Sequence, residues 1–227
     1  MTLPAFAFAP YRLSGAVYGA AMNHRGALEA LGDAVRQPPY KAPPSGVVLY
    51  VKPRNTFIAA GDAAWVDDAA PEVEVGAALG LVIGRTACAV REDDALDHVA
   101  GYLVVADFSV PHDSFFRPQI RFKARDSSCA FASAVVPRRS VDHPDALGVR
   151  VDVDRRRVQH TTTGDRVRGA ARLLADVSDF MTLNPGDVLL TGVAPGAPRV
   201  GAGAEVAVEI DGVGRLQVRV ARSEREA

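Results

Sequence analysis

Two long apolar runs that flank a short acidic segment constrain this fold more than any other feature of the sequence. The first run covers residues 77–83, and the second ends at Asp107. Each is shorter than the roughly 18 apolar residues that a membrane span requires, and each suits a buried strand. Residues 92–99 between them fit a short helix. We therefore expect a strand, a helix and a strand over residues 71–107.

The rest of the chain contains many short strands and few helices. Proline restricts both itself and the residue before it, so residues 37–44 form an extended loop. Apolar residues at helical spacing predict helices over residues 26–36 and 169–181. Because strands and helices do not alternate regularly, we expect a β-rich α+β fold, with residues 1–227 as a single domain. The other expected strands cover residues 12–20, 46–52, 56–60, 149–153, 157–163, 188–192, 205–210 and 215–220.

Composition argues against several classes of function. The formal net charge of -1 over 227 residues offers no attractive field for nucleic acid or for an anionic membrane. The N-terminal stretch lacks the basic and apolar regions of a signal peptide, so we expect a cytoplasmic protein. The two cysteines, Cys88 and Cys129, form no motif and are expected to be buried free thiols.

Carboxylates associated with the two apolar runs suggest a hard metal ion. Glu72 and Glu74 have an E-x-E spacing ahead of the first run, and Asp107 ends the second. Mg²⁺ and Ca²⁺ prefer oxygen ligands of this kind. The alternative is that the glutamates form a solvated strand edge and that Asp107 caps neighbouring backbone amides.

Three cations alternate with other residues near the middle of the chain. Arg121, Lys123 and Arg125 lie two residues apart within residues 120–126. An extended backbone would point all three side chains to one side, because side chains of a strand alternate. This segment is therefore a candidate anion-binding face, with plain surface charges as the alternative.

Several short motifs occur in a fixed order, and their joint spacing is more specific than any one of them. They are Lys52-Pro53, V-I-G at residues 82–84, G-Y-x-x-x-x-D-x-S at 101–109, K-x-x-D at 123–126 and L-N-P-G-D-V-L-L-T-G at 183–192. Over about residues 15–220 this order resembles the fumarylacetoacetate hydrolase family. The resemblance implies a β-roll of mixed strands with short flanking helices, usually dimeric. It also implies a divalent cation that chelates an oxo-acid and stabilises an enolate as a Lewis acid.

The metal positions of that family fall on residues without ligand atoms here. The family takes its metal from an E-x-E pair and a later aspartate. Counted back from Gly84, the pair falls on Gly76 and Ala78. Glu72 and Glu74 stand four residues too early, which is roughly 13 Å along an extended strand. We therefore expect these glutamates at a solvated strand edge rather than on a metal.

Other family positions are also replaced, although Asp107 matches the third metal ligand as a remnant. The histidine and glutamate that supply acid–base catalysis fall on Ala27 and Ala30, and the second threonine of a T-G-T motif is Val193. Mg²⁺ or Mn²⁺ is the cofactor that the resemblance implies, and the missing ligands leave open whether this chain binds it.

Longer runs resemble one branch of the family, the bifunctional isomerase/decarboxylases of homoprotocatechuate (4-hydroxyphenylacetate) degradation, in their N-terminal half. This branch implies a subunit of an isomerase/decarboxylase that acts on small unsaturated oxo-di- and tricarboxylates. The alternative is a catalytically degenerate partner, in a homodimer or in a heteromer with an active homologous subunit. The runs lie at residues 21–25, 37–44, 52–56, 84–93 and 114–118.

The candidate site residues follow from these motifs. Lys123 matches the lysine that binds substrate in the family and is our candidate for catalysis and carboxylate binding, with Arg121 as its neighbour. His24 and Arg25 are candidates for a relocated acid and an anion clamp, against the alternative of a plain turn. The remaining histidines have no ligand spacing and are expected to be ordinary surface or core residues; they are His98, His112, His143 and His160.

Overall fold

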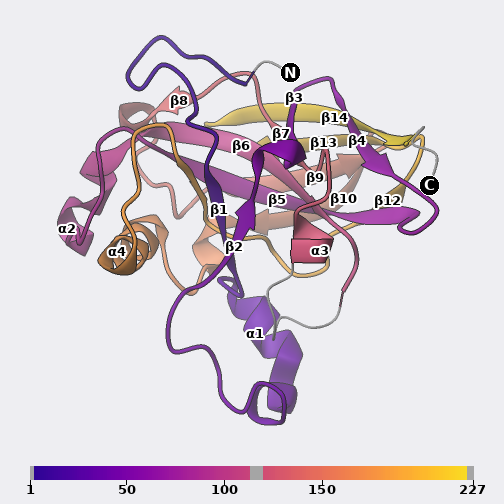
Figure 1. Ribbon diagram of the computed structural model, residues 1–227, viewed down its shortest axis with the longest axis horizontal. Coiled ribbons are helices and arrows are strands. Elements are labelled where there is room, and N and C mark those ends of the chain that lie inside the picture. The colour runs from indigo at the N-terminus through magenta and orange to yellow at the C-terminus, as the bar shows by residue number, and fades with distance from the viewer. Residues whose placement is uncertain (1–2, 113–119, 224–227) are drawn as a thin grey trace.

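Short helices flank a body of many strands (Figure 1). The computed structural model describes residues 3–112 and 120–223, so the sequence run at residues 114–118 lies outside the described residues. The α-helices are α1 (Arg25–Leu31), α2 (Glu92–Ala95), α3 (Ile120–Lys123) and α4 (Ala170–Phe180). The strands are β1 (Val17–Ala21), β2 (Val48–Lys52), β3 (Phe57–Ala59), β4 (Ala63–Val66), β5 (Glu72–Ile83), β6 (Val99–Ser109), β7 (Cys129–Phe131), β8 (Val136–Pro137), β9 (Gly148–Val153), β10 (Arg156–Thr162), β11 (Val188–Leu190), β12 (Arg199–Gly201), β13 (Glu205–Ile210) and β14 (Gly214–Arg222).

Within the described ranges the strands form one sheet of nine and one of five. The larger sheet runs β2-β1-β11-β5-β6-β7-β3, with β12 beside β5 and β8 beside β6. The smaller sheet runs β10-β9-β13-β14-β4. Each sheet is mixed, because β1 and β11, β3 and β7, and β14 and β4 are parallel pairs among antiparallel ones. The expected β-rich α+β fold of mixed strands with short flanking helices is confirmed.

Strands β5 and β6 form the centre of the core. Every residue of β5 from Val75 onwards is buried, and so is nearly all of β6. Strands β13 and β14 of the smaller sheet pack against β6, and the burial of successive residues shows that both faces of this strand pair are covered. A strand covered on both faces reads as a continuous apolar run rather than as an alternating one. This burial explains why the two long runs dominate the sequence.

The register between β5 and β6 positions the candidate site. Gly76 lies opposite Asp107, and Glu74 lies opposite Ser109. Residues two apart on a strand share one face, so positions 74 and 76 project to the same side of the sheet as Asp107. The position that the sequence assigns to a lost metal ligand is therefore the cross-strand neighbour of the remaining aspartate.

All three expected helices are present, with shifted ends, and residues 92–99 form α2 followed by a 3-10 segment, Leu96–His98. Helix α4 confirms the prediction over 169–181, and its buried residues recur at helical spacing, as Ala170, Leu173, Leu174 and Val177 do. The Asp145 carboxylate accepts hydrogen bonds of 2.9 and 3.1 Å from the Ala170 amide and so caps the first turn. Helix α1 is shorter than expected, because the backbone turns at Gly32 (φ +49°) into a 3-10 segment, Gly32–Arg36.

The predicted extended segment at 120–126 is wrong, because residues Ile120–Lys123 form helix α3. Successive helical side chains point about 100° apart, so the three cations do not share a face. Arg121 is exposed, Lys123 is buried, and Arg125 pairs with Asp67. The expectation for the cysteines is half right, since Cys129 is buried and Cys88 is exposed.

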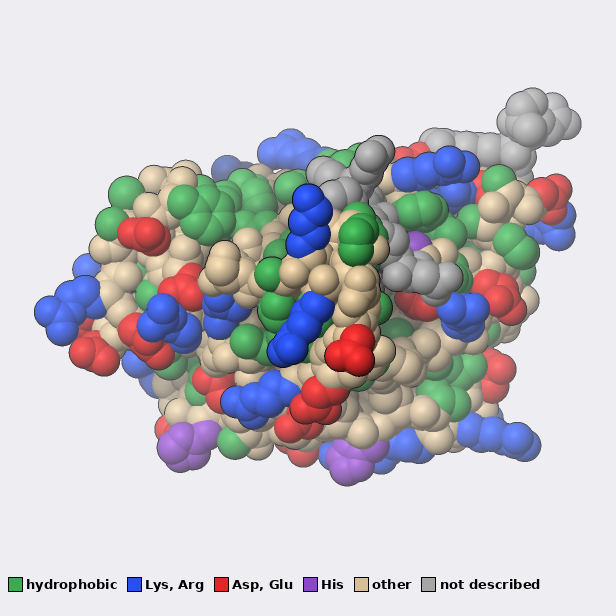
Figure 2. Space-filling view, turned by 90° about the horizontal axis from the view of Figure 1, so that it is seen from below, with side chains coloured by type: hydrophobic (Ala, Val, Ile, Leu, Met, Phe, Trp, Pro, Cys, Tyr) green, Lys and Arg blue, Asp and Glu red, His purple; other side chains and the backbone are tan. Residues whose placement is uncertain are grey.

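The surface seen in Figure 2 carries interspersed acidic and basic side chains, with hydrophobic groups between them. Among the described residues, no helix has the length and apolar character that a membrane crossing needs.

Candidate functional site

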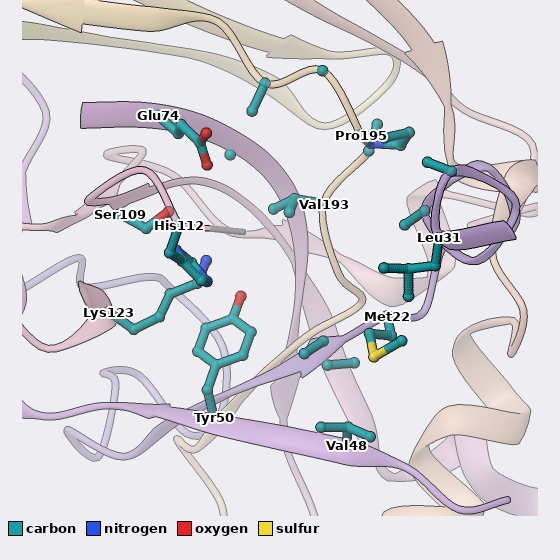
Figure 3. Close-up of a pocket in the computed structure, with 18 of the residues that line it drawn as sticks. Met22, Leu31, Val48, Tyr50, Glu74, Ser109, His112, Lys123, Val193 and Pro195 are labelled. Atoms are coloured by element: carbon teal, nitrogen blue, oxygen red, sulfur yellow. The ribbon is translucent and has the colours of Figure 1, made fainter. Parts of the chain in front are cut away.

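A cavity of about 600 Å³ opens between α1, the ends of β1 and β2, and the loop that follows β11. Met22, Leu31 and Val48 form part of an apolar wall, and Lys123, His112 and Tyr50 lie across from them (Figure 3). Small and apolar side chains supply most of the lining. The polar side chains that reach it are those of Tyr50, Glu74, Ser109, His112, Lys123 and Arg199.

Behind this polar side lies a buried group that we call the lysine–aspartate cluster, made of Tyr50, Lys52, Asp107 and Lys123. The Lys52 ammonium is 2.7 Å from Oδ1 of Asp107, and the Lys123 ammonium is 3.0 Å from Oδ2. The Tyr50 hydroxyl donates a hydrogen bond to the same Oδ2. The side chains of Lys52 and Asp107 are fully buried. Two cations therefore share one carboxylate, which leaves a net positive charge beside the cavity.

The two lysines differ in how their donors are used. Lys52 forms an ion pair with Asp107 and donates hydrogen bonds to the Phe108 carbonyl at 2.7 Å, the Ser128 carbonyl at 3.0 Å and the Ser128 hydroxyl at 3.2 Å, which accounts for all three N–H groups of an ammonium. The Lys123 nitrogen lies 4.5 Å from the centre of the Tyr50 ring, a favourable position for a cation. Lys123 also lines the cavity, whereas Lys52 does not.

Burial and neighbouring charges set the protonation states of the cluster. Burial alone would raise the pKa of Asp107, but Lys123 and Lys52 outweigh it and lower this pKa to about 2. Burial, followed by the charge of Asp107, raises the pKa of the Tyr50 phenol well above its ordinary value. Burial lowers the pKa of Lys52, although Asp107 opposes that change. At neutral pH, Asp107 is a carboxylate and Tyr50 a neutral donor.

Local sequence places the cluster in this geometry. Tyr50 and Lys52 are two residues apart on β2 and therefore project to the same side of the strand. Gly19 pairs with Tyr50 on the neighbouring strand β1, and a Cβ atom at Gly19 would lie 2.1 Å from the ring. A glycine is required at position 19, because any larger residue would displace the tyrosine that holds Asp107.

The residues present do not fit a divalent metal ion. In the described part of the chain, no group of three or more His, Cys, Asp or Glu side chains is placed to hold one. Both oxygens of Asp107 are already paired with ammonium groups. A Cβ atom at Gly76 would lie 2.6 Å from Cγ1 of Val193 and 2.8 Å from the backbone oxygen of Asp107. The space for a second ligand is therefore filled.

The sequence over residues 16–221 matches the C-terminal region of fumarylacetoacetate (FAA) hydrolase. This chain belongs to the fumarylacetoacetate hydrolase family. It is 38% identical over 205 residues to the 4-hydroxyphenylacetate degradation bifunctional isomerase/decarboxylase of Escherichia coli, covering 90% of this chain and 47% of the other. The chain thus spans about half the length of the bifunctional relatives it matches.

Solved structures of the family share the fold. The 5-carboxymethyl-2-hydroxymuconate delta-isomerase of Mycobacterium smegmatis superposes with a TM-score of 0.80 at 25% identity, covering 94% of this chain and 79% of that one. Fumarylpyruvate hydrolase of Pseudomonas aeruginosa, in complex with Mn²⁺ and pyruvate, gives a TM-score of 0.81 at 24% identity, covering 98% and 96%. The second likeness is evidence for the fold alone.

The family register places its replaced positions around one cavity. Ala27 and Ala30, which stand where the acid–base pair is expected, line the cavity from α1. Gly76 and Val193 line it from β5 and from the loop after β11. Lys123 also lies here. The cavity thus gathers five of the positions that the resemblance assigns to the family's chemistry, and four of these five residues have apolar or absent side chains. Ala78 and Asp107 do not line it.

The other candidate residues lie apart from the cavity lining. His24 is buried and caps α1, because its Nδ1 accepts a hydrogen bond of 3.1 Å from the Gly26 amide. Arg25 donates to the Gly164 carbonyl at 3.4 Å, and Arg121 is exposed on α3. Their proposed roles in binding and catalysis stay predictions. Glu72 is exposed at the start of β5.

Glu74, expected at a solvated strand edge, lines the cavity and pairs with Arg199 at 3.3 Å. Three other residues, Tyr50, Lys52 and His112, were not singled out as site residues from the sequence. His112 lines the cavity three residues after Ser109, although its spacing to other histidines gave no signal. Tyr50 and Lys52 gave a usable signal, since their two-residue spacing on an apolar strand predicts a shared face.

Proposed function

We propose that this chain is a subunit of an isomerase/decarboxylase that acts on unsaturated oxo-di- or tricarboxylates in 4-hydroxyphenylacetate (homoprotocatechuate) catabolism. The observation that carries the proposal is the cavity, in which the Lys123 ammonium stands among apolar walls. Such a lining suits an unsaturated carbon chain that ends in a carboxylate. The relatives named as isomerase/decarboxylases of this catabolism support the reaction type and the pathway, and the family resemblance supplies the substrate class.

Lys123 would supply the charge that both reactions need. Loss of carbon dioxide, or removal of a proton next to an oxo group, leaves an electron pair that spreads onto the oxo oxygen as an enolate. A fixed ammonium in a buried site stabilises that negative charge more than water does. Lys123 is held in place by Asp107 and by the Tyr50 ring, so it does not have to reorganise during the reaction.

His112 is our candidate for moving the proton during isomerisation. Its Nδ1 lies 2.8 Å from the Val110 carbonyl oxygen, which accepts but cannot donate, so Nδ1 carries the hydrogen. In the neutral ring, Nε2 is then the basic nitrogen. The ring stacks on Phe122 at 5.1 Å between centroids, which fixes its plane at the cavity wall.

A second candidate function is a catalytically degenerate partner of an active homologous subunit. Ala27, Ala30 and Gly76 favour it, because they leave the cavity without the side chains that the family motifs place there. The chain spans about half the length of its bifunctional relatives. A homodimer, or a heteromer with a homologous subunit, is the assembly that we propose, in the cytoplasm and with a small oxo-carboxylate as its ligand.

Turnover by the purified chain separates the two functions. Decarboxylation of 5-oxopent-3-ene-1,2,5-tricarboxylate and isomerisation of 2-hydroxyhepta-2,4-diene-1,7-dioate are followed for the chain alone, with and without Mg²⁺ or Mn²⁺. Activity that is lost in Lys123→Ala and kept in Glu72→Ala supports the enzyme. Inactivity that an added homologous subunit restores supports the degenerate partner. Inactivity towards both compounds in either setting contradicts the proposed substrate class.

A further inference from the structure

We propose that the cavity binds its carboxylate ligand without a metal ion, with the Lys123 ammonium meeting the charge that a divalent cation would otherwise meet. The proposal rests on the proposed function for the class of ligand, and it extends that function to the means of recognition. It follows from three observations about Asp107, Val193 and the donors of Lys123.

Asp107 is not available as a metal ligand. Its side chain is fully buried, and it does not line the cavity, whereas Tyr50 and Lys123 do. The two ammonium groups, 2.7 and 3.0 Å from its oxygens, leave a local charge that repels a divalent cation. Asp107 therefore serves as the counter-ion that fixes the direction of Lys123.

Val193 closes the space where a second ligand would stand. Its Cγ1 atom lies 2.6 Å from the position of a Cβ atom on Gly76, so a side chain there would overlap a methyl group. Glu74, the carboxylate among the lining residues, is engaged by the Arg199 guanidinium at 3.3 Å. Neither β5 position thus offers an uncompensated oxygen to a cation.

The Lys123 ammonium has N–H groups available to donate to a ligand. Its ammonium has three N–H groups, and within residues 3–112 and 120–223 the Asp107 carboxylate at 3.0 Å is its hydrogen-bond acceptor. Its side chain is 9% exposed, which leaves the nitrogen screened from bulk water while it lines the cavity. Lys52 cannot take this role, because its side chain is fully buried and its three donors are used by Phe108 and Ser128.

These features define the ligand that fits. A carboxylate, or a carboxylate with an adjacent oxo group, would accept from Lys123, because an ammonium donates but cannot accept. The remainder of the ligand would lie against Met22, Leu31 and Val48, which surround the opposite side of the cavity (Figure 3). An oxo-dicarboxylate with a short hydrocarbon chain has this combination of charge and apolar surface.

Wild-type protein tests the proposal directly with 2-oxoadipate as an unreactive probe. Isothermal titration calorimetry in EDTA and in excess Mg²⁺ should give dissociation constants that agree within about twofold. Mn²⁺ added to the protein with the probe should keep the electron paramagnetic resonance signal of the free ion. A requirement for Mg²⁺, an Mn²⁺ ion held at the site, or the absence of binding under both conditions would overturn the proposal.

Two lysine variants assign the binding to Lys123. Lys123→Met removes the donor and should weaken binding about tenfold to hundredfold, the range for a hydrogen bond to a charged group. Lys41→Met removes an exposed lysine that does not line the cavity and should leave the dissociation constant unchanged. Equal affinities in Lys123→Met and wild type would overturn the assignment. If Lys123→Met fails to fold, the wild-type measurements still decide the question of the metal.

Measurements of binding and of turnover distinguish a failure of this inference from a failure of the proposed function. Metal-free binding of 2-oxoadipate without turnover of the unsaturated substrates would support the inference and reject the stand-alone enzyme. Turnover that depends on an Mn²⁺ ion bound at Asp107 would reject the inference and support the enzyme.

Discussion

The lysine–aspartate cluster and the surroundings of Arg166 are both buried and charged, but they handle their charge in opposite ways. In the cluster, each charged group has an oppositely charged partner at 2.7 or 3.0 Å. Arg166 is 3% exposed, and within the described residues none of its three side-chain nitrogens has a hydrogen-bond partner. Its neighbour across an isolated β-bridge is His24, whose buried Nε2 also lacks a partner there.

The comparison shows that burial alone does not decide the cost of a charge. Burial lowers the pKa of Arg166 to about 10, although Asp145 and Asp165 oppose that change. The same force on Asp107 is outweighed, and its pKa falls in the direction that favours its charge. A compensated charge is costly to break, whereas an uncompensated one is costly to keep. Each prediction below tests one side of this contrast.

Lys52→Met should produce the largest effect. It leaves Asp107 with one cation and leaves the Phe108 and Ser128 carbonyls without their donor. Removing one partner of a buried ion pair costs about 3–5 kcal/mol, so the free energy of unfolding should fall by that amount. Urea denaturation measures it, with the exposed Lys41→Met as the matched control. A loss below about 1 kcal/mol would show that the cluster does not stabilise the fold.

Acid should weaken the cluster within a defined pH window. The folded pKa of Asp107, about 2, lies below its ordinary 3.8. The unfolded chain therefore binds more protons between these values, and the folding stability of about 2 kcal/mol from this group is present above pH 3.8 and lost as the pH falls through about 2. Stability measured from pH 5 to pH 2 should show this loss in wild type and lack it in Asp107→Asn. Equal slopes in the two proteins would contradict it.

Arg166→Met should have a smaller effect, and one of opposite sign. Within the described residues the Arg166 guanidinium has no hydrogen-bond partner, so replacing this buried charge by an apolar side chain of similar length removes a desolvation cost. We expect the free energy of unfolding to rise by about 1–3 kcal/mol in urea denaturation. Arg36→Met, at an exposed arginine, should change it by less than about 0.5 kcal/mol. A destabilised Arg166→Met would mean that Arg166 does have a compensating partner in the folded protein.

The place of Asp107 beside β5 could be predicted from the sequence, but the residues that pair with Asp107 could not. Counting back from Gly84 assigned Gly76 to the site, because strand register is preserved along an apolar run; the structure pairs it with Asp107. The partners of Asp107 come from β2, 55 and 57 residues earlier, and from helix α3, and no local pattern encodes contacts between such distant segments. Local alternation at 120–126 predicted a strand, but residues Ile120–Lys123 form helix α3. Lys123 is the last residue of this helix and pairs with Asp107.

The smallest expected effect is on the reactivity of the Cys129 thiol, which reports whether the lysine–aspartate cluster is intact. Burial raises the pKa of Cys129 to about 12, and the nearby charge of Lys52 opposes that change. Cys129 is fully buried, whereas Cys88 is exposed, so Ellman's reagent should titrate one thiol per native chain and two after unfolding. In Cys88→Ser the native protein should be unreactive. Adding Lys52→Met to that variant should make Cys129 reactive, because opening of the weakened cluster exposes it. If Cys129 stayed unreactive there while the protein was destabilised, the cluster would not be the element that holds this part of the sheet closed.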